Sequence, residues 1–453
     1  MLNTLFQLDK NSTNISTEIL AGITTFVTMA YILAVIPAIL ADSGLGKEAV
    51  FFATCLSAGL ISIAMGVFVN LPVVLGPGMG VVAYFATLTA AQGVISWQVA
   101  LGVVFIASII FFLLTITQVC KILVTAIPDS LKHAVTIGIG LFITFIGLKM
   151  SHVVRAVTHM GASLNEVNAG NGVANLAFFE WDLTLGNFAN ADTLLALIGL
   201  IVTSALIVLR TRGAILLGIV FSTLVGIPMG LTDVHTMHIG LPSWHNLNIG
   251  AMDIKGALNM SLLAIIFTVT FIVLLDTFGT LVSTTYRAKI FTTKNNGSAV
   301  INKGMSVGAL GSCFSTFLGV PALAVYLESM AGISVGGKTG LTAVTAGILF
   351  LFSLMFSSIF IAIPHAATAP ALILVGAFMI SSVQHIDFQD FSEGLPAFLT
   401  IVLMPFTYSI ANGISAGIVF HVLLKVVAGN WRKVHWMMYI LTILIIVRFI
   451  YFN

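Results

Sequence analysis

Two acidic side chains stand inside long apolar runs of the sequence. Asp276 lies in AIIFTVTFIVLLDTFGTLVS, and Glu328 lies in VPALAVYLESMAG. An ionised carboxylate at the centre of a bilayer costs at least about 2.5–3.5 kcal/mol, so such residues usually serve a function and face the protein interior or a water-filled cavity. Because desolvation favours the neutral form of a buried acid, each side chain could exchange a proton at physiological pH. The two acids are therefore predicted to carry protons and anchor a substrate, with a helix-to-helix hydrogen bond as the alternative for each.

A second motif suggests a different chemistry. The stretch GISVGGKT, residues 332–339, matches G-x-x-x-x-G-K-[ST], the loop that binds nucleotide phosphates in ATPases. That loop works between a β-strand and a helix of a soluble domain. Here it follows a broken apolar segment and leads into GLTAVTAGILFLFSLMFSSIFIA, which is apolar on every face. We therefore reject an ATPase and expect a tight glycine loop at a membrane boundary, with Lys338 as a positively charged anchor.

The composition identifies the elements that must hold these residues. Of the 453 residues, 58% are hydrophobic and 8% are charged, whereas a soluble domain carries about 25% charged residues. Apolar runs long enough to cross a bilayer, about 17–25 residues each, recur from end to end. The chain is therefore predicted to be an all-α polytopic membrane protein with almost no room for a soluble catalytic domain.

Enzyme chemistry and metal binding have little support in these apolar runs. The sequence has no HExxH motif, and no nucleophile–base set or metal triad stands out within the predicted helices. The cysteines Cys55, Cys120 and Cys313 form no CxxC pair, which indicates packing residues. Metal binding by the loosely spaced histidines 235, 238 and 245 is a minor alternative. We predict no enzyme activity, no metal and no cofactor.

Fourteen membrane segments are predicted along the chain. They lie at about 17–41, 49–70, 72–92, 97–119, 127–149, 192–209, 213–231, 257–283, 300–318, 319–337, 340–362, 364–384, 395–411 and 412–428. The third and tenth are short broken segments rich in glycine and proline. A further apolar stretch, 434–451, is expected to be interfacial or partly inserted.

The segments fall into two sets of seven with the same order of features. A long first helix opens each set, a broken segment comes third, and an Ile-Pro pair begins the fifth, at Ile127-Pro128 and Ile363-Pro364. Because seven is odd, the second set must cross the membrane in the opposite direction, which gives an inverted repeat typical of secondary transporters. We predict a first repeat at 1–231, a second at 257–428, and an apolar tail at 429–453.

Charged residues sort to one side of the predicted membrane. With a cytoplasmic N-terminus, most lysines and arginines fall in cytoplasmic loops, as the positive-inside rule expects. The outer loops, about 150–191 and 232–256, collect acidic residues instead. This sorting explains the net charge of +2, so nucleic-acid binding has no support. The expected location is the cell membrane, with lipid around the helices.

Six stretches together carry a resemblance to a known family. They are TEILAGITTFVTMAYI (17–32), LPVVLGPGMG (71–80), GIGLFITFIGLK (138–149), LLDTFGTL (274–281), YLESMAGISVGGKTGLTAV (326–344) and MPFTYSIANGISAG (404–417). In this order they resemble the azaguanine-type purine permeases of the nucleobase and ascorbate transporter superfamily. The resemblance implies fourteen helices in two inverted repeats, core and gate domains drawn from both repeats, short strands that meet between the third and tenth segments, and a homodimer. The GGKTG loop belongs to the same pattern, so its match to a phosphate loop is coincidental.

The resemblance also implies which residues act. In that superfamily acids of the eighth and tenth segments bind the base, coupled to protons, and by motif these fall on Asp276 and Glu328. Further contacts to the base are predicted nearby, at Gly80, Val81, Val82, Phe85, Thr277, Gly279 and Tyr326. The glycine backbone of the third segment could offer N–H and C=O groups to a ligand or could only pack helices together. Phe85 could stack on the base or fill the core.

The sequence departs from the family pattern near the predicted site. The usual Asn-Pro of the first helix is Ile36-Pro37, and the usual Gly-Leu-Asn-Ala of the third segment is Gly-Val-Val-Ala at 80–83. The hydroxyl-rich run before the Tyr-x-Glu of the tenth segment is Val-Pro-Ala-Leu-Ala at 320–324. Because a pocket rejects wrong bases through its polar groups, these changes predict an altered specificity with little effect on the fold.

The sequence therefore predicts a proton-coupled importer of a purine base, such as adenine, guanine or hypoxanthine. Transport of an anion or another small solute is one alternative, because sulfate permeases share the architecture implied by the resemblance. A sensor that transports nothing is another, because it would tolerate the loss of polar residues at the site.

Overall fold

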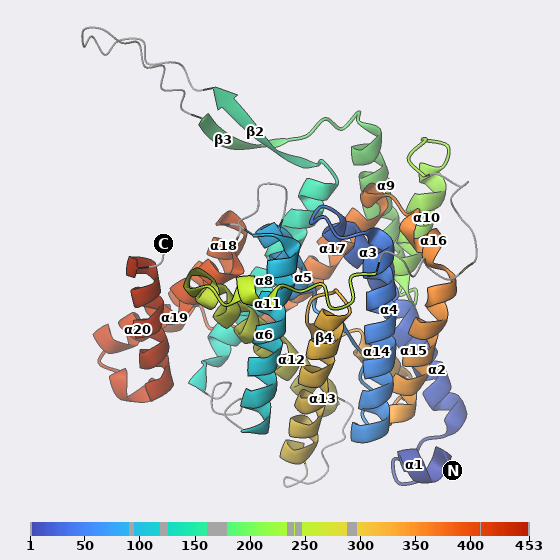
Figure 1. The fold of residues 1–453 in the computed structure, drawn as a ribbon, viewed down its shortest axis with the longest axis horizontal. Helices are drawn as coiled ribbons and strands as arrows, with labels where there is room; N and C mark the ends of the chain where they lie inside the picture. The colour runs from blue at the N-terminus through green and yellow to red at the C-terminus, as the bar shows by residue number, and fades with distance from the viewer. Residues whose placement is uncertain are drawn as a thin grey trace.

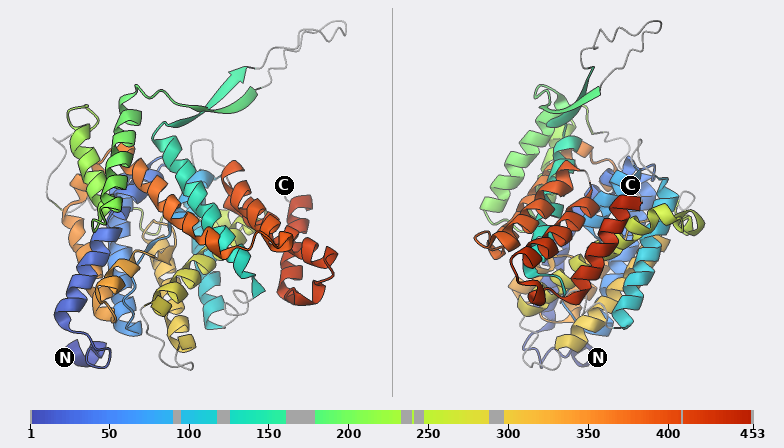
Figure 2. Two further views of the ribbon diagram at one scale, coloured as in Figure 1. Left: turned by 180° about the vertical axis from the view of Figure 1, so that it is seen from behind. Right: turned by 90° about the vertical axis from the view of Figure 1, so that its left-hand side faces the viewer.

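The computed structural model describes residues 2–89, 95–117, 126–160, 179–232, 240, 247–287, 297–407 and 409–451. In this part of the chain the protein is a bundle of helices with a β-hairpin projecting from one end (Figure 1). Both views in Figure 2 show the hairpin at the end of the bundle away from the N-terminus. Among the described residues, 8 helical stretches are long and apolar enough to cross a membrane, and shorter apolar helices accompany them. The predicted multi-pass helical fold is confirmed.

The first seven predicted segments coincide with described elements. The first segment breaks after Met29 into two helices, and the third starts with a strand before its helix begins. In chain order the elements are α2 (Ile15–Met29) with α3 (Ile32–Ala41), α4 (Lys47–Ala64) with the π-helical turn η1 (Met65–Val69), β1 (Leu75–Pro77) with α5 (Met79–Thr89), α6 (Trp97–Ile116), α8 (Asp129–Met150), α9 (Ala191–Val208) and α10 (Ala214–Gly226).

The second seven segments repeat this order. Again the third of the set combines a short strand with a helix. The elements are α12 (Leu263–Arg287), α13 (Gly297–Phe317), β4 (Leu323–Val325) with α14 (Ser329–Val335), α15 (Gly340–Phe352) with α16 (Ser357–Ile361), α17 (His365–Ile380), α18 (Phe391–Phe406) and α19 (Ile410–Val427).

Short elements and the C-terminal tail complete the described chain. The predicted outer loop 150–191 contains the antiparallel hairpin of β2 (Val154–Met160) and β3 (Phe179–Leu185). The apolar stretch 434–451 forms α20 (Trp436–Tyr451), which packs against α19. The remaining elements are α1 (Leu2–Phe6), α11 (Ile254–Ala257) and the 3-10 turns at Met260–Leu262, Ser353–Met355, Ser381–His385 and Trp431–Lys433. The histidines 235, 238 and 245 and Cys120 lie outside the described residues.

The two broken segments meet as a pair of short strands. β1 and β4 pair antiparallel. Gly78 N donates to Ala322 O at 2.9 Å, and Tyr326 N donates to Val74 O at 3.1 Å, which extends the pairing at both ends. An unsatisfied backbone group inside a membrane costs several kcal/mol, and the pairing avoids this cost. The structure thus brings the third and tenth segments together as the resemblance implies.

Two serines at corresponding places support the strands. Leu75 N donates to Ser62 Oγ at 3.0 Å, and Leu323 N donates to Ser312 Oγ at 3.1 Å. Each serine hydroxyl also donates to the carbonyl of the same strand residue, at 3.3 Å and 3.1 Å respectively. Ser62 belongs to the second segment and Ser312 to the ninth. Equivalent serines of the two halves therefore hydrogen-bond the backbone of the two strands.

The helices pack in two groups. In the first group α2 packs against α14 and α15, α4 against α15, and α6 against α12 and α13. In the second group α8 packs against α17 and α18, α9 against α10 and α17, and α18 against α19. Each group therefore draws helices from both halves of the chain. The domain limits at 1–231, 257–428 and 429–453 stay predictions.

The loop that resembles a phosphate-binding motif holds a carboxylate of the protein itself. Glu18 of α2 is fully buried. Its carboxylate accepts hydrogen bonds from Lys338 N at 2.9 Å, from Thr339 N at 3.3 Å and from Thr342 Oγ1 at 2.6 Å. Helix N-termini favour anions because their first N–H groups lack helical partners. The GGKT stretch therefore joins α15 to α2 through this internal anion, and Lys338 Nζ donates to the Ser12 carbonyl at 3.3 Å.

We predict that Glu18→Gln destabilises the protein. The substitution removes the charge and turns an NH₂ group toward hydrogen-bond donors, which should cost about 1–3 kcal/mol. Thermal unfolding of the purified protein in detergent should show a lower melting temperature. Glu48→Gln is the matched control, because Glu48 is an exposed acid in the first turn of α4. Equal melting temperatures for the two variants would contradict this role of Glu18.

Candidate functional site

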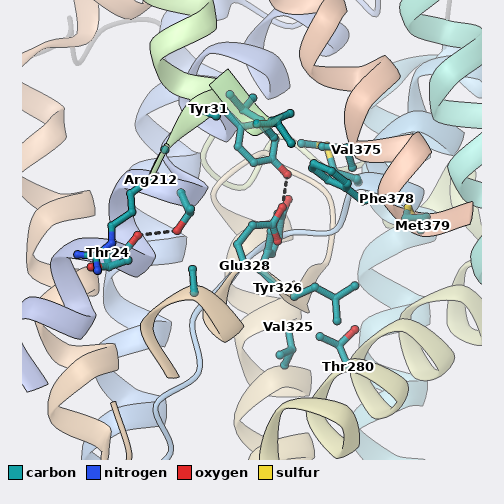
Figure 3. A pocket seen from close by; sticks show the side chains of 18 of the residues that line it. Thr24, Tyr31, Arg212, Thr280, Val325, Tyr326, Glu328, Val375, Phe378 and Met379 are labelled. Carbon is teal, nitrogen blue, oxygen red and sulfur yellow. Dashed lines mark hydrogen bonds between the residues drawn. The ribbon is translucent and has the colours of Figure 1, made fainter. Parts of the chain in front are cut away.

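A cavity of about 740 Å³ lies where the two helix groups face each other. Its wall includes both predicted acids and Gly78, Ala324 and Val325, which lie at or beside the pairing of β1 with β4, the strand crossing. Figure 3 shows Val325 and Glu328 among the residues that line it. The first helix group supplies most of the polar side chains. The complete wall consists of Thr24, Thr28, Tyr31, Gly78, Met79, Gly80, Ile139, Ile207, Arg210, Thr211, Arg212, Gly213, Ala214, Ile215, Asp276, Thr280, Ala324, Val325, Tyr326, Leu327, Glu328, Ala331, Ser334, Val335, Val375, Phe378 and Met379.

Glu328 is held at the end of the strand crossing. It directly precedes α14, and two residues separate it from the end of β4. Tyr31 Oη donates to Glu328 Oε1 at 2.6 Å, as Figure 3 shows. Tyr31 is fully buried and lies in the break between α2 and α3. A hydrogen bond to a carboxylate is stronger than one between neutral groups, so Tyr31 fixes the direction in which Glu328 points.

Asp276 reaches the same crossing from α12. A Cβ atom added to Gly78 would lie 3.5 Å from Asp276 Oδ2 and 3.0 Å from Ala324 Cβ. The Asp276 carboxylate therefore lies beside the end of β1, and a side chain at Gly78 would crowd Ala324 of the paired strand. The next residue, Thr277, is fully buried, and its hydroxyl has no hydrogen-bond partner in the described part of the chain.

The predicted minor contacts divide into two sets. Gly80 and Tyr326 line the cavity. Val81, Val82, Phe85 and Thr277 are buried at 1% exposure or less and are absent from the wall, as is Gly279. Phe85 thus fills the core, which was one of its two predicted interpretations.

The N-terminus of α5 offers backbone donors beside Gly80. The first helical hydrogen bond joins Val82 N to Gly78 O at 2.9 Å, and Gly78 N is bonded to Ala322 O. The N–H groups of the first helical residues therefore have no partner within the helix. Met79 and Gly80 lie in this turn and line the cavity, so the backbone can donate to a ligand at this point.

Several wall residues were missed by sequence reasoning. Tyr31 lies in the motif TEILAGITTFVTMAYI, but its contact with Glu328 spans nearly 300 positions and has no local signal. Arg210 and Arg212 belong to the connection between α9 and α10 and fit the pattern of charged loop residues. Phe378 lies in an apolar helix among many similar residues.

A buried strand crossing, two intramembrane carboxyl groups and a cavity between two helix groups define a secondary transporter. Comparison with known proteins agrees with this class. The family model described as "Permease family" matches residues 16–416, so the chain belongs to that family. It is a permease of the cell membrane and not an enzyme.

Curated relatives match nearly the whole chain. Adenine permease AdeQ of Escherichia coli (strain K12) is 38% identical, with 96% of this chain and 93% of the relative covered. Adenine permease AdeP of the same organism is 37% identical, with 100% and 97% covered. Guanine/hypoxanthine permease PbuO of Bacillus subtilis (strain 168) is 33% identical, with 98% and 99% covered. The resemblance to purine permeases is confirmed.

The fold is also found among solved structures. The transmembrane domain of the cyanobacterial bicarbonate transporter BicA superposes with a TM-score of 0.63 at 18% identity and covers 89% of this chain and 97% of that chain. SLC26A9 gives a TM-score of 0.65 at 12% identity, with 91% and 66% covered. These likenesses confirm the predicted fold class.

Two stretches match the G-x-S-x-G nucleophile motif of hydrolases, at 332–336 and 413–417. The first spans the end of α14 and the second lies within α19. Neither forms the strand-to-helix turn that exposes a nucleophilic serine. The two motif matches therefore do not form hydrolase sites.

We predict that Tyr326→Phe weakens the strand crossing. Tyr326 Oη donates to Pro77 O at 2.6 Å between the two broken segments, and this bond is buried. Removing the hydroxyl should cost about 1–3 kcal/mol, because the buried carbonyl loses a donor. The melting temperature in detergent should fall. Tyr439→Phe, which removes an exposed hydrogen bond of 2.8 Å to Trp431 O, should leave it nearly unchanged, and equal losses would contradict the assignment.

Proposed function

We propose that this permease imports a purine nucleobase together with a proton. The observation that carries the proposal is the presence of Asp276 and Glu328, from the eighth and tenth segments, on the wall of one cavity at the strand crossing. The adenine and guanine/hypoxanthine permeases among its relatives supply the substrate class.

The chemistry of the wall suits the polar edge of a purine. A carboxylate accepts hydrogen bonds from ring or exocyclic N–H groups, and a protonated carboxyl can also donate one. The N-terminal turn of α5 supplies backbone N–H donors on the same side. In this proposal Glu328 holds the base, and the turn at Met79 and Gly80 donates to its ring nitrogens or carbonyl oxygen.

The second carboxyl couples the base to a proton. Two ionised carboxylates in one cavity repel each other, and protonation of one removes the repulsion. Tyr31 donates to Glu328, which favours its ionised, hydrogen-bond-accepting form. We therefore assign proton uptake to Asp276 and base binding to Glu328. Each ligand then improves the binding of the other.

Alternating access follows from the two helix groups. We assign the first group, which includes the strand crossing and both acids, as the core, and the second group as the gate. The cavity lies between them. Binding of the base and the proton shifts the equilibrium between arrangements that open to opposite sides of the membrane. With a cytoplasmic N-terminus, the Arg210–Gly213 connection belongs to the cytoplasmic side.

The unusual residues near the site bear on which base is carried. Val81 and Val82 are buried, and Ala324 brings only a methyl group to the wall. Polar recognition beside the strand crossing therefore relies on the two carboxyl groups, the hydroxyls of Tyr326 and Thr280, and the backbone. We propose that this permease reads fewer polar positions of the base than a hydroxyl-rich site would.

Anion transport is a second candidate, favoured by Arg210 and Arg212 in the cavity wall. Both arginines belong to the α9–α10 connection, whereas the strand crossing carries the two acids. An anion at the crossing would meet like charges. Labelled bicarbonate and sulfate therefore serve as comparison substrates.

The test is uptake of labelled adenine, guanine and hypoxanthine into cells that lack their own purine permeases. Wild type should accumulate at least one base, and an uncoupler should abolish accumulation. Glu328→Gln and Asp276→Asn should each lose transport at equal surface expression. A hydrogen bond to a charged group contributes about 1.5–3 kcal/mol, so uptake at low substrate should fall roughly 10- to 150-fold for Glu328→Gln.

Glu48→Gln controls for the loss of a carboxylate outside the cavity and should transport like wild type. Well-expressed wild type that carries bicarbonate or sulfate but no purine would replace the proposal with the second candidate. Normal uptake in both acid variants would show that Glu328 and Asp276 do not form the transport site.

A further inference from the structure

One wall of the cavity is apolar and comes from the second helix group. Val375, Phe378 and Met379 of α17 line it. They occupy positions i, i+3 and i+4, which lie on one face of a helix. Phe378 is 51% exposed, and Figure 3 shows its side chain with those of Val375 and Met379 among the residues that line the cavity.

The packing of α17 against α8 fixes which face points to the cavity. A Cβ atom on Gly376 would lie 2.0 Å from Thr144 Oγ1 and 2.3 Å from Gly140 O. A Cβ atom on Gly140 would lie 2.7 Å from Met379 Cβ. Because real Cβ atoms do not approach this closely, the two helices can meet only with glycine at both places. This contact holds the helix in the rotation that turns Phe378 toward the cavity.

The opposite wall is polar. Tyr31, Asp276 and Glu328 come from the first helix group. A ligand that satisfies both walls needs a hydrogen-bonding edge for the acids and a flat apolar face for the phenyl ring. Heteroaromatic bases have this shape, and a base stacked on an aromatic side chain gains about 1–3 kcal/mol.

We propose that Phe378 is the stacking residue for the transported base and that the gate contributes it. This inference rests on the proposed function and names a recognition residue that sequence reasoning did not find. Phe85, the aromatic candidate of the sequence, is 1% exposed and does not line the cavity. The base thus touches the core through its polar edge and the gate through its face, so binding links the two helix groups.

The test measures both binding and uptake of labelled adenine, guanine and hypoxanthine by the full chain in proteoliposomes. Phe378→Ala should raise the Kd for the base roughly 5- to 150-fold, the equivalent of the stacking contribution. Phe378→Tyr should bind within about threefold of wild type, because it keeps the ring. Phe378→Leu, which stays apolar but has no ring, should bind clearly more weakly than Phe378→Tyr.

Phe398→Ala is the matched control. Phe398 is 52% exposed on α18 and does not line the cavity, so its removal should leave the Kd unchanged. Melting temperatures distinguish a loss of stacking from a loss of folding. If Phe378→Ala fails to fold, the comparison of Phe378→Leu with Phe378→Tyr tests the stacking role. Wild-type affinity in Phe378→Ala, or in Phe378→Leu, would overturn this inference while leaving the proposed function intact. A wild type that binds none of the three bases would overturn both.

Discussion

Two broken chain segments cross inside this membrane protein, where their backbone groups lack helical hydrogen-bond partners. The pairing of β1 with β4 supplies the missing hydrogen bonds. The alternative, unpaired backbone groups in a membrane interior, is too costly to persist. Ser62 and Ser312 support the strands from equivalent helices of the two halves. The two halves are therefore bound together at the point where helix ends and backbone donors can face a ligand.

The proposed role of the two acids depends on this crossing. Glu328 follows β4, and Asp276 lies beside Gly78 just beyond β1. In our proposal the crossing makes the core a rigid unit with one polar wall, and the gate adds a wall with an aromatic ring. A solute that needs both walls would bind best when the two groups are close. The ligand would then bind one arrangement of the two groups more tightly than the other. A ligand can shift a conformational equilibrium only through such a difference in affinity.

Much of this architecture could be predicted from sequence, because polar groups are costly to bury in lipid and membrane segments therefore contain few of them. Long apolar runs revealed the helices, and Asp276 and Glu328 stood out because acids are rare there. Contacts between distant segments left no such signal. Tyr31 meets Glu328 only because the first helix breaks beside the tenth segment. Glu18 looked like an ordinary acid near a helix start, and Phe378 resembled its apolar neighbours. The placement of Phe85 in the core followed from packing, which local sequence does not specify.

The central claim is that the carboxyl pair couples a base to a proton, and proton flux tests it most directly. The measurement is the luminal pH of proteoliposomes, with a pH-sensitive dye inside, after external adenine, guanine or hypoxanthine is added without a pre-formed gradient. The account predicts that a transported base acidifies the lumen through wild type, and that Asp276→Asn abolishes the acidification. Entry of the labelled base with no change in luminal pH would contradict it.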